Sequence, residues 1–203
     1  MKFHFPKIEP PPWATNEQWS DWKWHLKNSL KSEKDFTRFF RLTPQEQQAF
    51  QLGGQVFQIR STPYYARLAH QTDTDDPIRR MLVPHADELK TGAQQMLDPL
   101  GERQNNPTPR IIHRYSDRAL FLVTDQCSVY CRYCTRKHFT GQNQALLREQ
   151  EYNAGLNYIQ QHPGIREVIL SGGDPLTLSN NQLEKILSDL RKIEHIEIIR
   201  IGT

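Results

Sequence analysis

The stretch "ALFLVT" at residues 119–124 decides the fold, because it is a continuous apolar run of strand length. Strands of a parallel sheet are buried on both faces and therefore have such runs. Two similar segments follow, "EVIL" at 167–170 and "IEIIRIG" at 196–202, and helices are predicted between them over 144–162 and 180–193. Strand, helix, strand, helix and strand at this spacing predict a parallel sheet with right-handed crossovers.

The two predicted helices each have an apolar face at helical spacing. We expect these faces to consist of Leu147, Tyr152, Leu156 and Ile159 in the first helix, and of Leu183, Ile186, Leu187 and Leu190 in the second.

The N-terminal half of the chain predicts short helices joined by loops. Residues 15–30 favour a helix that begins at a capping box of Thr15 with Gln18. We expect one face of this helix to be an anchor on the main domain, formed by Trp19, Trp22, Leu26 and Leu30. Three further helix starts place a proline directly after a capping residue, at Thr43–Pro44, Thr62–Pro63 and Asp76–Pro77.

A loop rich in proline and asparagine, "DPLGERQNNPTPR" at 98–110, separates this half from the strands. We therefore expect an N-terminal helical region over 1–110 and an α/β region over 111–203. Because the chain stops at Thr203, directly after a strand that no helix covers, we expect it to be an N-terminal fragment of a longer barrel protein.

Composition narrows the class of protein. The net charge of +3 is too small to argue for nucleic acid by itself. The sequence contains no run of 18 apolar residues, so it predicts no membrane span. The N-terminus lacks the apolar segment of a signal peptide. Three cysteines, an odd number, favour metal binding or catalysis over disulfides. We expect a cytoplasmic protein that does not bind membranes.

All three cysteines lie in "CSVYCRYC", directly after the first strand. The spacing of Cys127, Cys131 and Cys134 lets one loop surround a single metal centre, and thiolates suit zinc or iron–sulfur clusters. Clusters are usually held by four cysteines, so three would leave one iron of a [4Fe–4S] cluster open to a substrate or cofactor.

Two other interpretations of the cysteines remain open. His138 could complete a Cys3His zinc site, in which the basic neighbours Arg132, Arg136 and Lys137 would contact RNA phosphates. Alternatively, the three residues could be buried free thiols.

A second loop supports a cofactor site. "SGGDP" at 171–175 follows the next strand, and loops that leave the carboxyl ends of neighbouring parallel strands meet at one edge of the sheet. Gly172 and Gly173 would let the backbone approach a ligand closely, although a tight turn also explains them.

These motifs resemble the radical S-adenosylmethionine enzymes. In that family the Cys-x3-Cys-x-aromatic-Cys signature, with Tyr133 as the aromatic here, binds a [4Fe–4S] cluster whose open iron is chelated by S-adenosylmethionine. The resemblance implies a partial (β/α)6 barrel, truncated here after its third strand, and chemistry by a 5′-deoxyadenosyl radical. It also implies that S-adenosylmethionine contacts Tyr133, Gly172, Gly173 and Asp174.

The match is closer to one family, the lysine 2,3-aminomutases and their relatives. It rests on "WSDWKWHLKN" (19–28), "DDPIRRMLVP" (75–84), "DPLGE" (98–102) and "HRYSDRALFLVTDQCSVYCRYCTRKHFTGQ" (113–142). The resemblance implies pyridoxal phosphate as second cofactor, contacted by Tyr115 and Arg118, and an amino acid whose carboxylate is bound by Arg136. The amino group would migrate from the α- to the β-carbon.

The resemblance also sets limits and partners. The family's Schiff-base lysine and the acidic residues for the substrate's distal amine are expected beyond Thr203, so the sequence does not choose between lysine, glutamate, arginine or another amino acid. An electron donor of the flavodoxin or ferredoxin type and a homo-oligomer of the full-length form are expected, without nucleic acid. A different radical S-adenosylmethionine reaction is the alternative enzyme.

Overall fold

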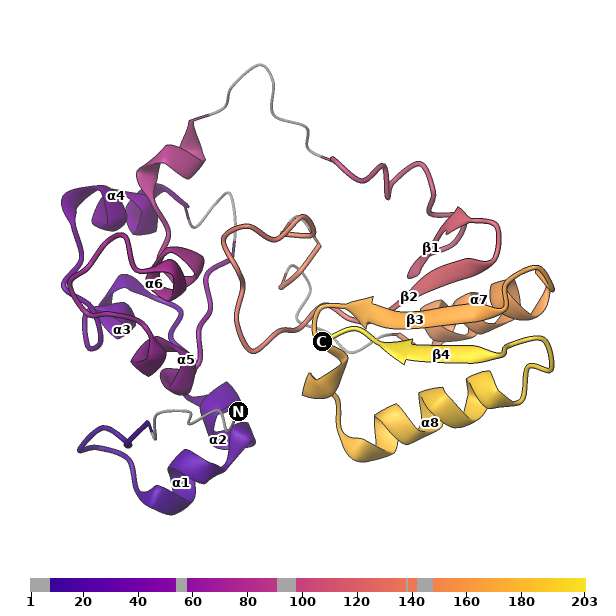
Figure 1. Ribbon diagram of the computed structural model, residues 1–203, viewed down its shortest axis with the longest axis horizontal. Helices are drawn as coiled ribbons and strands as arrows, with labels where there is room; N and C mark the ends of the chain where they lie inside the picture. The colour runs from indigo at the N-terminus through magenta and orange to yellow at the C-terminus, as the bar shows by residue number, and fades with distance from the viewer. Residues whose placement is uncertain (1–7, 54–57, 91–97, 138, 142–147) are drawn as a thin grey trace, which may run out of the picture. The chain divides into compact units, whose positions relative to one another are not determined.

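A computed structural model of the chain describes residues 8–53, 58–90, 98–137, 139–141 and 148–203 (Figure 1). The chain forms two compact units, the first of Met1–Gly92 with Ser128–Cys134 and the second of Ala93–Cys127 with Thr135–Thr203. The cysteine segment therefore contributes to both units. This division differs from the expected boundary in the 98–110 loop, so the domains 1–110 and 111–203 stay a prediction.

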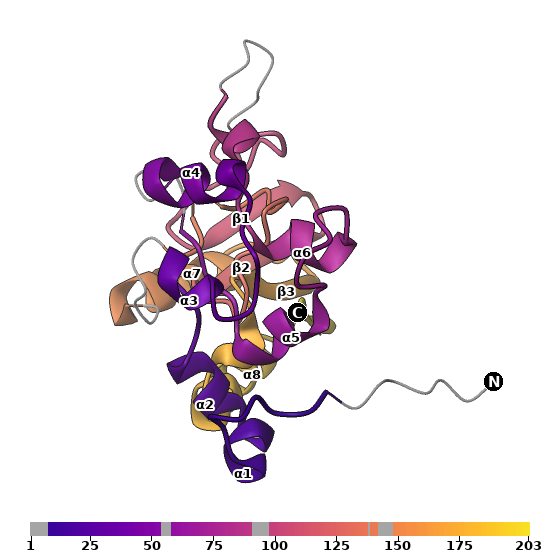
Figure 2. The same ribbon diagram turned by 90° about the vertical axis from the view of Figure 1, so that its left-hand side faces the viewer.

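The first unit is built from short helices joined by loops, as the sequence predicts (Figure 2). Its elements in the described part are α1 (Asn16–Ser20), α2 (Trp22–Lys27), α3 (Glu33–Phe36), α4 (Pro44–Gly53), α5 (Pro63–Leu68), α6 (Pro77–Leu82) and the 3-10 helix η1 (Ala86–Leu89). The three predicted proline starts are confirmed, because α4, α5 and α6 each begin at the proline. The capping residues Thr43, Thr62 and Asp76 each accept, with a side-chain oxygen, a hydrogen bond from a backbone amide of the first turn.

The predicted single helix over 15–30 is wrong in one respect. The Thr15–Gln18 capping box forms, but the chain breaks at Asp21, which ends α1 and caps α2 with its side chain. The break changes the direction of the apolar face. Trp22 is consequently 46% exposed, whereas Trp24 and the buried His25 pack beside Trp19.

A buried ion pair ties the middle helices of the first unit together. The Arg79 guanidinium on α6 donates to both carboxylate oxygens of Glu46 on α4, at 3.0 and 2.8 Å. It also donates to the backbone carbonyls of Gln71 and Arg41, at 2.6 and 2.9 Å, and lies over the ring of Phe40. The two charged side chains are only 1% and 6% exposed. One residue thus satisfies polar groups from three separate segments.

The second unit contains a mixed sheet with two long helices (Figure 1). Its elements in the described part are β1 (Ile111–Tyr115), β2 (Arg118–Thr124), α7 (Glu149–Gln160), β3 (Glu167–Gly172), the 3-10 helix η2 (Pro175–Thr177), α8 (Asn180–Arg191) and β4 (Ile198–Ile201). The strand order is β1-β2-β3-β4. The pairs β2–β3 and β3–β4 are parallel, which confirms the three predicted strands and their parallel arrangement.

Sequence analysis missed β1. This strand pairs antiparallel with β2, with Ile111 opposite Phe121 and Tyr115 opposite Arg118. The connection is the two residues Ser116–Asp117, which lack the glycine or asparagine that usually reveals a hairpin turn. The preceding segment, residues 98–110, is rich in proline and asparagine and predicts a loop, and no local signal in it marks the start of a strand.

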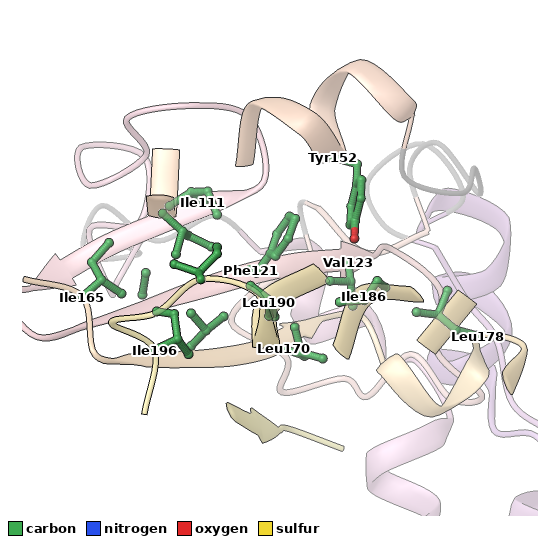
Figure 3. Close-up of a cluster of buried hydrophobic side chains, with 14 residues drawn as sticks. Ile111, Phe121, Val123, Tyr152, Ile165, Leu170, Leu178, Ile186, Leu190 and Ile196 are labelled. Carbon is green, nitrogen blue, oxygen red and sulfur yellow. The ribbon is translucent and has the colours of Figure 1, made fainter. Parts of the chain in front are cut away.

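Both helices of the second unit pack on the same face of the sheet (Figure 3). Phe121 and Val123 of β2 point to this face together with Leu170 of β3, and they meet Ile159 of α7 and Leu190 of α8. The predicted apolar faces are confirmed for Tyr152, Leu156, Ile159, Leu183, Ile186, Leu187 and Leu190, and Leu147 lies outside the described residues. Because side chains alternate along a strand, Leu120 and Leu122 point to the opposite face.

A small charged cluster joins α7 to α8. Asp189 accepts hydrogen bonds from Lys185, Lys192 and Tyr152, all at 2.7–2.8 Å. The hydrogen bonds from Lys185, Lys192 and Tyr152 hold the pKa of the Asp189 carboxyl well below its usual range. Burial, together with this carboxylate, raises the pKa of the Tyr152 hydroxyl.

Among the described helices, none combines the length and the apolar character needed to cross a membrane.

Candidate cofactor and substrate site

The loops that follow β2 and β3 meet at one edge of the sheet, as predicted. Thr124 at the end of β2 pairs with Gly172 at the end of β3. Beyond the strands, the Gly173 amide donates to the Thr124 carbonyl at 2.6 Å, and the Asp174 amide donates to the Gln126 carbonyl at 2.8 Å. The glycine loop is therefore fixed to the residues that lead directly into Cys127.

This contact explains why positions 172 and 173 are glycines. Gly172 has a φ of +111°, a backbone conformation that side chains strongly disfavour. A Cβ at Gly172 would collide with the Thr124 carbonyl oxygen, and one at Gly173 would collide with the Gln126 backbone. Asp174 caps η2 by accepting the Leu176 amide. Contacts of these residues with a cofactor stay a prediction.

The middle of the cysteine segment is held by the helical unit. Val129 packs into that unit's hydrophobic core, and the Tyr130 amide donates to the Arg60 carbonyl at 2.9 Å. The Arg132 amide donates to the carbonyl of Met81 on α6 at 3.0 Å. The residues between the cysteines thus act as anchors, and one function of the N-terminal region is to fix the loop.

Arg132 makes the strongest of these anchors. Its Nε and Nη2 atoms donate to the Glu88 carboxylate at 2.7–3.2 Å, and Nη1 donates to the Gln58 carbonyl at 3.3 Å. The side chain is only 7% exposed. A guanidinium engaged in this way does not suit contact with RNA phosphates, and His138, the fourth ligand of the zinc alternative, lies outside the described residues.

Cys127, Cys131 and Cys134 are each partly exposed, which argues against the alternative of three buried thiols. Cys131 and Cys134 are joined by a turn in which the Cys134 amide donates to the Cys131 carbonyl at 3.0 Å. Burial raises the pKa of the Cys131 thiol, so metal binding there would release a proton. In the described ranges, no group of three or more His, Cys, Asp or Glu side chains is arranged to hold a metal ion.

The donor set nevertheless suits an iron–sulfur cluster. Three thiols within eight residues, all accessible to solvent in part, supply soft ligands of one kind. Tyr133 stands between the second and third of them and is 73% exposed, with its hydroxyl donating to the Met81 sulfur at 3.3 Å. Its ring is therefore available for stacking on a flat ligand.

Arg136 forms an ion pair in the second unit that sequence reasoning did not foresee. Its Nε lies 3.0 Å from both carboxylate oxygens of Glu102, and its Nη2 lies 2.6 Å from Oε1. The third nitrogen, Nη1, is 3.5 Å from the Ser171 hydroxyl at the end of β3. The predicted carboxylate-binding arginine is thus placed at the same edge of the sheet as the glycine loop.

Tyr115 and Arg118 lie at the other end of β2. They face each other across the β1–β2 turn, with the guanidinium over the ring at 5.6 Å and paired to Asp117. This pairing with Asp117 raises the pKa of Arg118 further. A strand of seven residues spans roughly 20 Å. The structure therefore brings these two residues together but separates them from the glycine loop, and Tyr115 remains 58% exposed.

Two carboxylates were missed as parts of the site. Glu88 holds Arg132, and Glu102 holds Arg136, over separations of 44 and 34 residues. The only sequence signal was the position of Glu102 in the "DPLGE" segment, which carried the resemblance without a role for its glutamate.

Comparison with known proteins supports the resemblance. Residues 121–203 match the Radical SAM superfamily. L-lysine 2,3-aminomutase of Acetoanaerobium sticklandii is 40% identical over 190 residues, which are 94% of this chain and 46% of the relative. The enzyme of the same name from Bacillus subtilis is 39% identical over 202 residues, 100% and 43% of the two chains. Glutamate 2,3-aminomutase of Clostridioides difficile is 36% identical over 190 residues, 94% and 45%. The chain spans about half the length of these relatives.

Proposed function

Because this chain is a homologue of the lysine 2,3-aminomutases within the radical S-adenosylmethionine superfamily, we propose that it contributes the cluster-binding part of an amino acid 2,3-aminomutase. The reaction would move an amino group from the α- to the β-carbon of a free amino acid. The observation that carries the proposal is the cysteine segment, which leaves the carboxyl end of β2 beside the glycine loop of β3.

The arrangement of the second unit supports a partial (β/α)6 barrel as its complete architecture. In a barrel the helices cover the outer face of a parallel sheet and leave the inner face to the site. Here α7 and α8 cover the face of Phe121 and Val123, and Leu120 and Leu122 point away from them. The antiparallel β1 pairs with β2 and forms the edge of the sheet opposite to β4.

Cys127, Cys131 and Cys134 would hold a [4Fe–4S] cluster, with one iron left for S-adenosylmethionine. When bound, these groups supply a 5′-deoxyadenosyl radical that abstracts a hydrogen atom. The protein's contribution is positioning. The exposed ring of Tyr133 would stack on the adenine, and the loop of Gly172, Gly173 and Asp174 would offer backbone groups at the same edge as Cys127.

The amino acid and pyridoxal phosphate would lie along the face of the sheet opposite α7 and α8. Arg136 would bind the substrate carboxylate near the end of β3, and Arg118 with Tyr115 would contact the pyridoxal phosphate at the opposite end of β2. The described residues do not distinguish between lysine, glutamate and another amino acid as the substrate. The proposal includes an electron donor of the flavodoxin or ferredoxin type and a homo-oligomer, without nucleic acid. It also includes a reducing, cytoplasmic location, in which thiols do not form disulfides.

Anaerobic reconstitution with iron and sulfide tests the proposal. We expect a brown protein with four irons per chain, the number in a [4Fe–4S] cluster, whose visible absorption and reduced-state electron paramagnetic resonance signal change on addition of S-adenosylmethionine. Cys131→Ala should lose the cluster, whereas Cys131→Ala that binds as much iron as the wild type would contradict the assignment. A colourless protein that binds one zinc per chain would instead support the Cys3His alternative.

A further inference from the structure

The pairing of Arg136 with Glu102 determines which part of the guanidinium is free. An arginine carries five N–H donors, one on Nε and two on each Nη atom. Glu102 accepts from the edge formed by Nε and Nη2. Nη1 and Nη2 keep three hydrogens, one of which reaches the Ser171 hydroxyl at 3.5 Å, so two remain for hydrogen bonds to a second carboxylate. This free edge is the one that lies toward Ser171.

The backbone on both sides of the pair is fixed. The Glu102 amide donates to the Asp98 carboxylate at 2.9 Å, and the Asn105 side chain donates to the Gly101 carbonyl at 2.7 Å. The Arg136 carbonyl accepts from the Thr140 amide and hydroxyl, at 2.9 and 3.2 Å. Neither residue is therefore at the tip of an unsupported loop, and the direction of the guanidinium is set by the carboxylate that it meets.

Displacement of Glu102 by a ligand would be unfavourable. Its side chain is 10% exposed, so a carboxylate separated from Arg136 would stay buried without a cation. A ligand carboxylate that binds the free edge avoids this cost, although it experiences repulsion from Glu102 across the guanidinium. Sharing of Arg136 between two carboxylates is thus more favourable than competition for it.

We propose that Glu102 is a positioning residue, which orients Arg136 so that its Nη1–Nη2 edge receives the carboxylate of the amino acid substrate at the carboxyl end of β3. The inference rests on the proposed function, because it assumes that Arg136 binds a substrate carboxylate. It adds the residue that aims Arg136 and the edge of the guanidinium that is used.

Nuclear magnetic resonance of the 203-residue chain labelled with 15N-arginine tests this inference directly, with L-lysine and L-glutamate as probes. We expect the Nε–H signal of Arg136 to be protected from exchange without ligand and to remain so with ligand, while the Nη signals shift. In Glu102→Ala the Nε protection should be lost and the dissociation constant of the amino acid should rise about tenfold. Glu102→Asp should restore part of the affinity, and Glu184→Ala, which changes an exposed glutamate of α8, should change neither quantity.

Tighter amino acid binding by Glu102→Ala, or loss of Nε protection when ligand is added to the wild type, would show that Glu102 competes with the substrate and would overturn the inference. It would also be overturned if neither amino acid moved the Arg136 signals. These results are separate from the cluster reconstitution, which depends on the cysteines and decides the proposed function.

Discussion

The buried ion pair of Arg79 with Glu46 allows a quantitative test of what stabilises the helical unit. Replacing Arg79 with methionine keeps a long apolar side chain but removes every donor. It leaves the Glu46 carboxylate, only 6% exposed, without its cation. It also leaves the carbonyls of Gln71 and Arg41 without the hydrogen bonds that they accept at 2.6 and 2.9 Å.

The expected magnitude follows from these losses. Removing one partner of a buried ion pair costs about 3–5 kcal/mol, and a buried carbonyl that loses its donor costs about 1–3 kcal/mol. The losses overlap, because water that enters the vacated space can solvate all of these groups. We therefore expect Arg79→Met to lower the free energy of unfolding of the first unit by about 3–5 kcal/mol. The double variant Glu46→Leu with Arg79→Met should lose less free energy of unfolding than Arg79→Met alone, because it leaves no uncompensated charge.

Urea unfolding followed by tryptophan fluorescence measures this effect in the helical unit, because that unit contains all four tryptophans of the chain, Trp13, Trp19, Trp22 and Trp24. Arg80→Met is the matched control, since it makes the same change at the next, exposed position of α6. Equal stability of Arg79→Met and Arg80→Met would refute the reasoning. A double variant less stable than Arg79→Met would also refute it, because it would show that the unpaired carboxylate carries no cost.

Three further changes test other parts of the structure. Gly173→Ala places a Cβ against the backbone of the neighbouring loop, so we expect this variant to bind less iron after anaerobic reconstitution. Gly202→Ala is the control, because the nearest atom there is 3.4 Å from the added Cβ. Equal iron content in the two variants would contradict this. Arg132→Gln breaks the ion pair with Glu88, whose side chain is 20% exposed, and should lower the free energy of unfolding by about 1–2 kcal/mol. We expect a lower urea midpoint by tryptophan fluorescence. An unchanged midpoint would count against the role of Arg132 as an anchor. The folded-state pKa of Asp189 lies below the ordinary 3.8. Its pairs therefore stabilise the fold above about pH 4, and this stability is lost as the pH falls through the folded-state pKa. Asp189→Asn should weaken the acid dependence of the urea midpoint measured by circular dichroism, and an unaltered dependence would argue against the pairing.

Much of the architecture could be predicted because its causes are local. Three helices begin at prolines whose preceding residue caps them, and a cap acts within one turn. The runs at 119–124 and 167–170 are long enough and apolar enough to require burial on both faces, which a parallel sheet provides. A parallel sheet also brings the cysteine and glycine loops to one edge, because both leave the carboxyl ends of neighbouring strands.

Local exceptions were harder to predict. Asp21 fits the helical pattern around it, yet its side chain caps the helix that follows and divides the predicted helix in two. The strand β1 has no turn signal, and its hydrogen bonds come from β2 and from the segment 105–108 that precedes it. The break at Asp21 is made by a local hydrogen bond from the Lys23 amide, whereas β1 depends on partners elsewhere in the chain.

The amino-acid sequence by itself determined the resemblance to a family, the spacing of the three thiols and the order of the three parallel strands and the two helices between them. Only the tertiary structure decided which charges meet. Arg132 and Arg136 both follow a cysteine closely in the sequence, but one is an anchor held by Glu88 and the other is oriented by Glu102 toward the end of β3. The physical reason is that an ion pair depends on the distance and burial of two side chains, and residues 34 to 44 positions apart carry no local pattern that specifies either quantity.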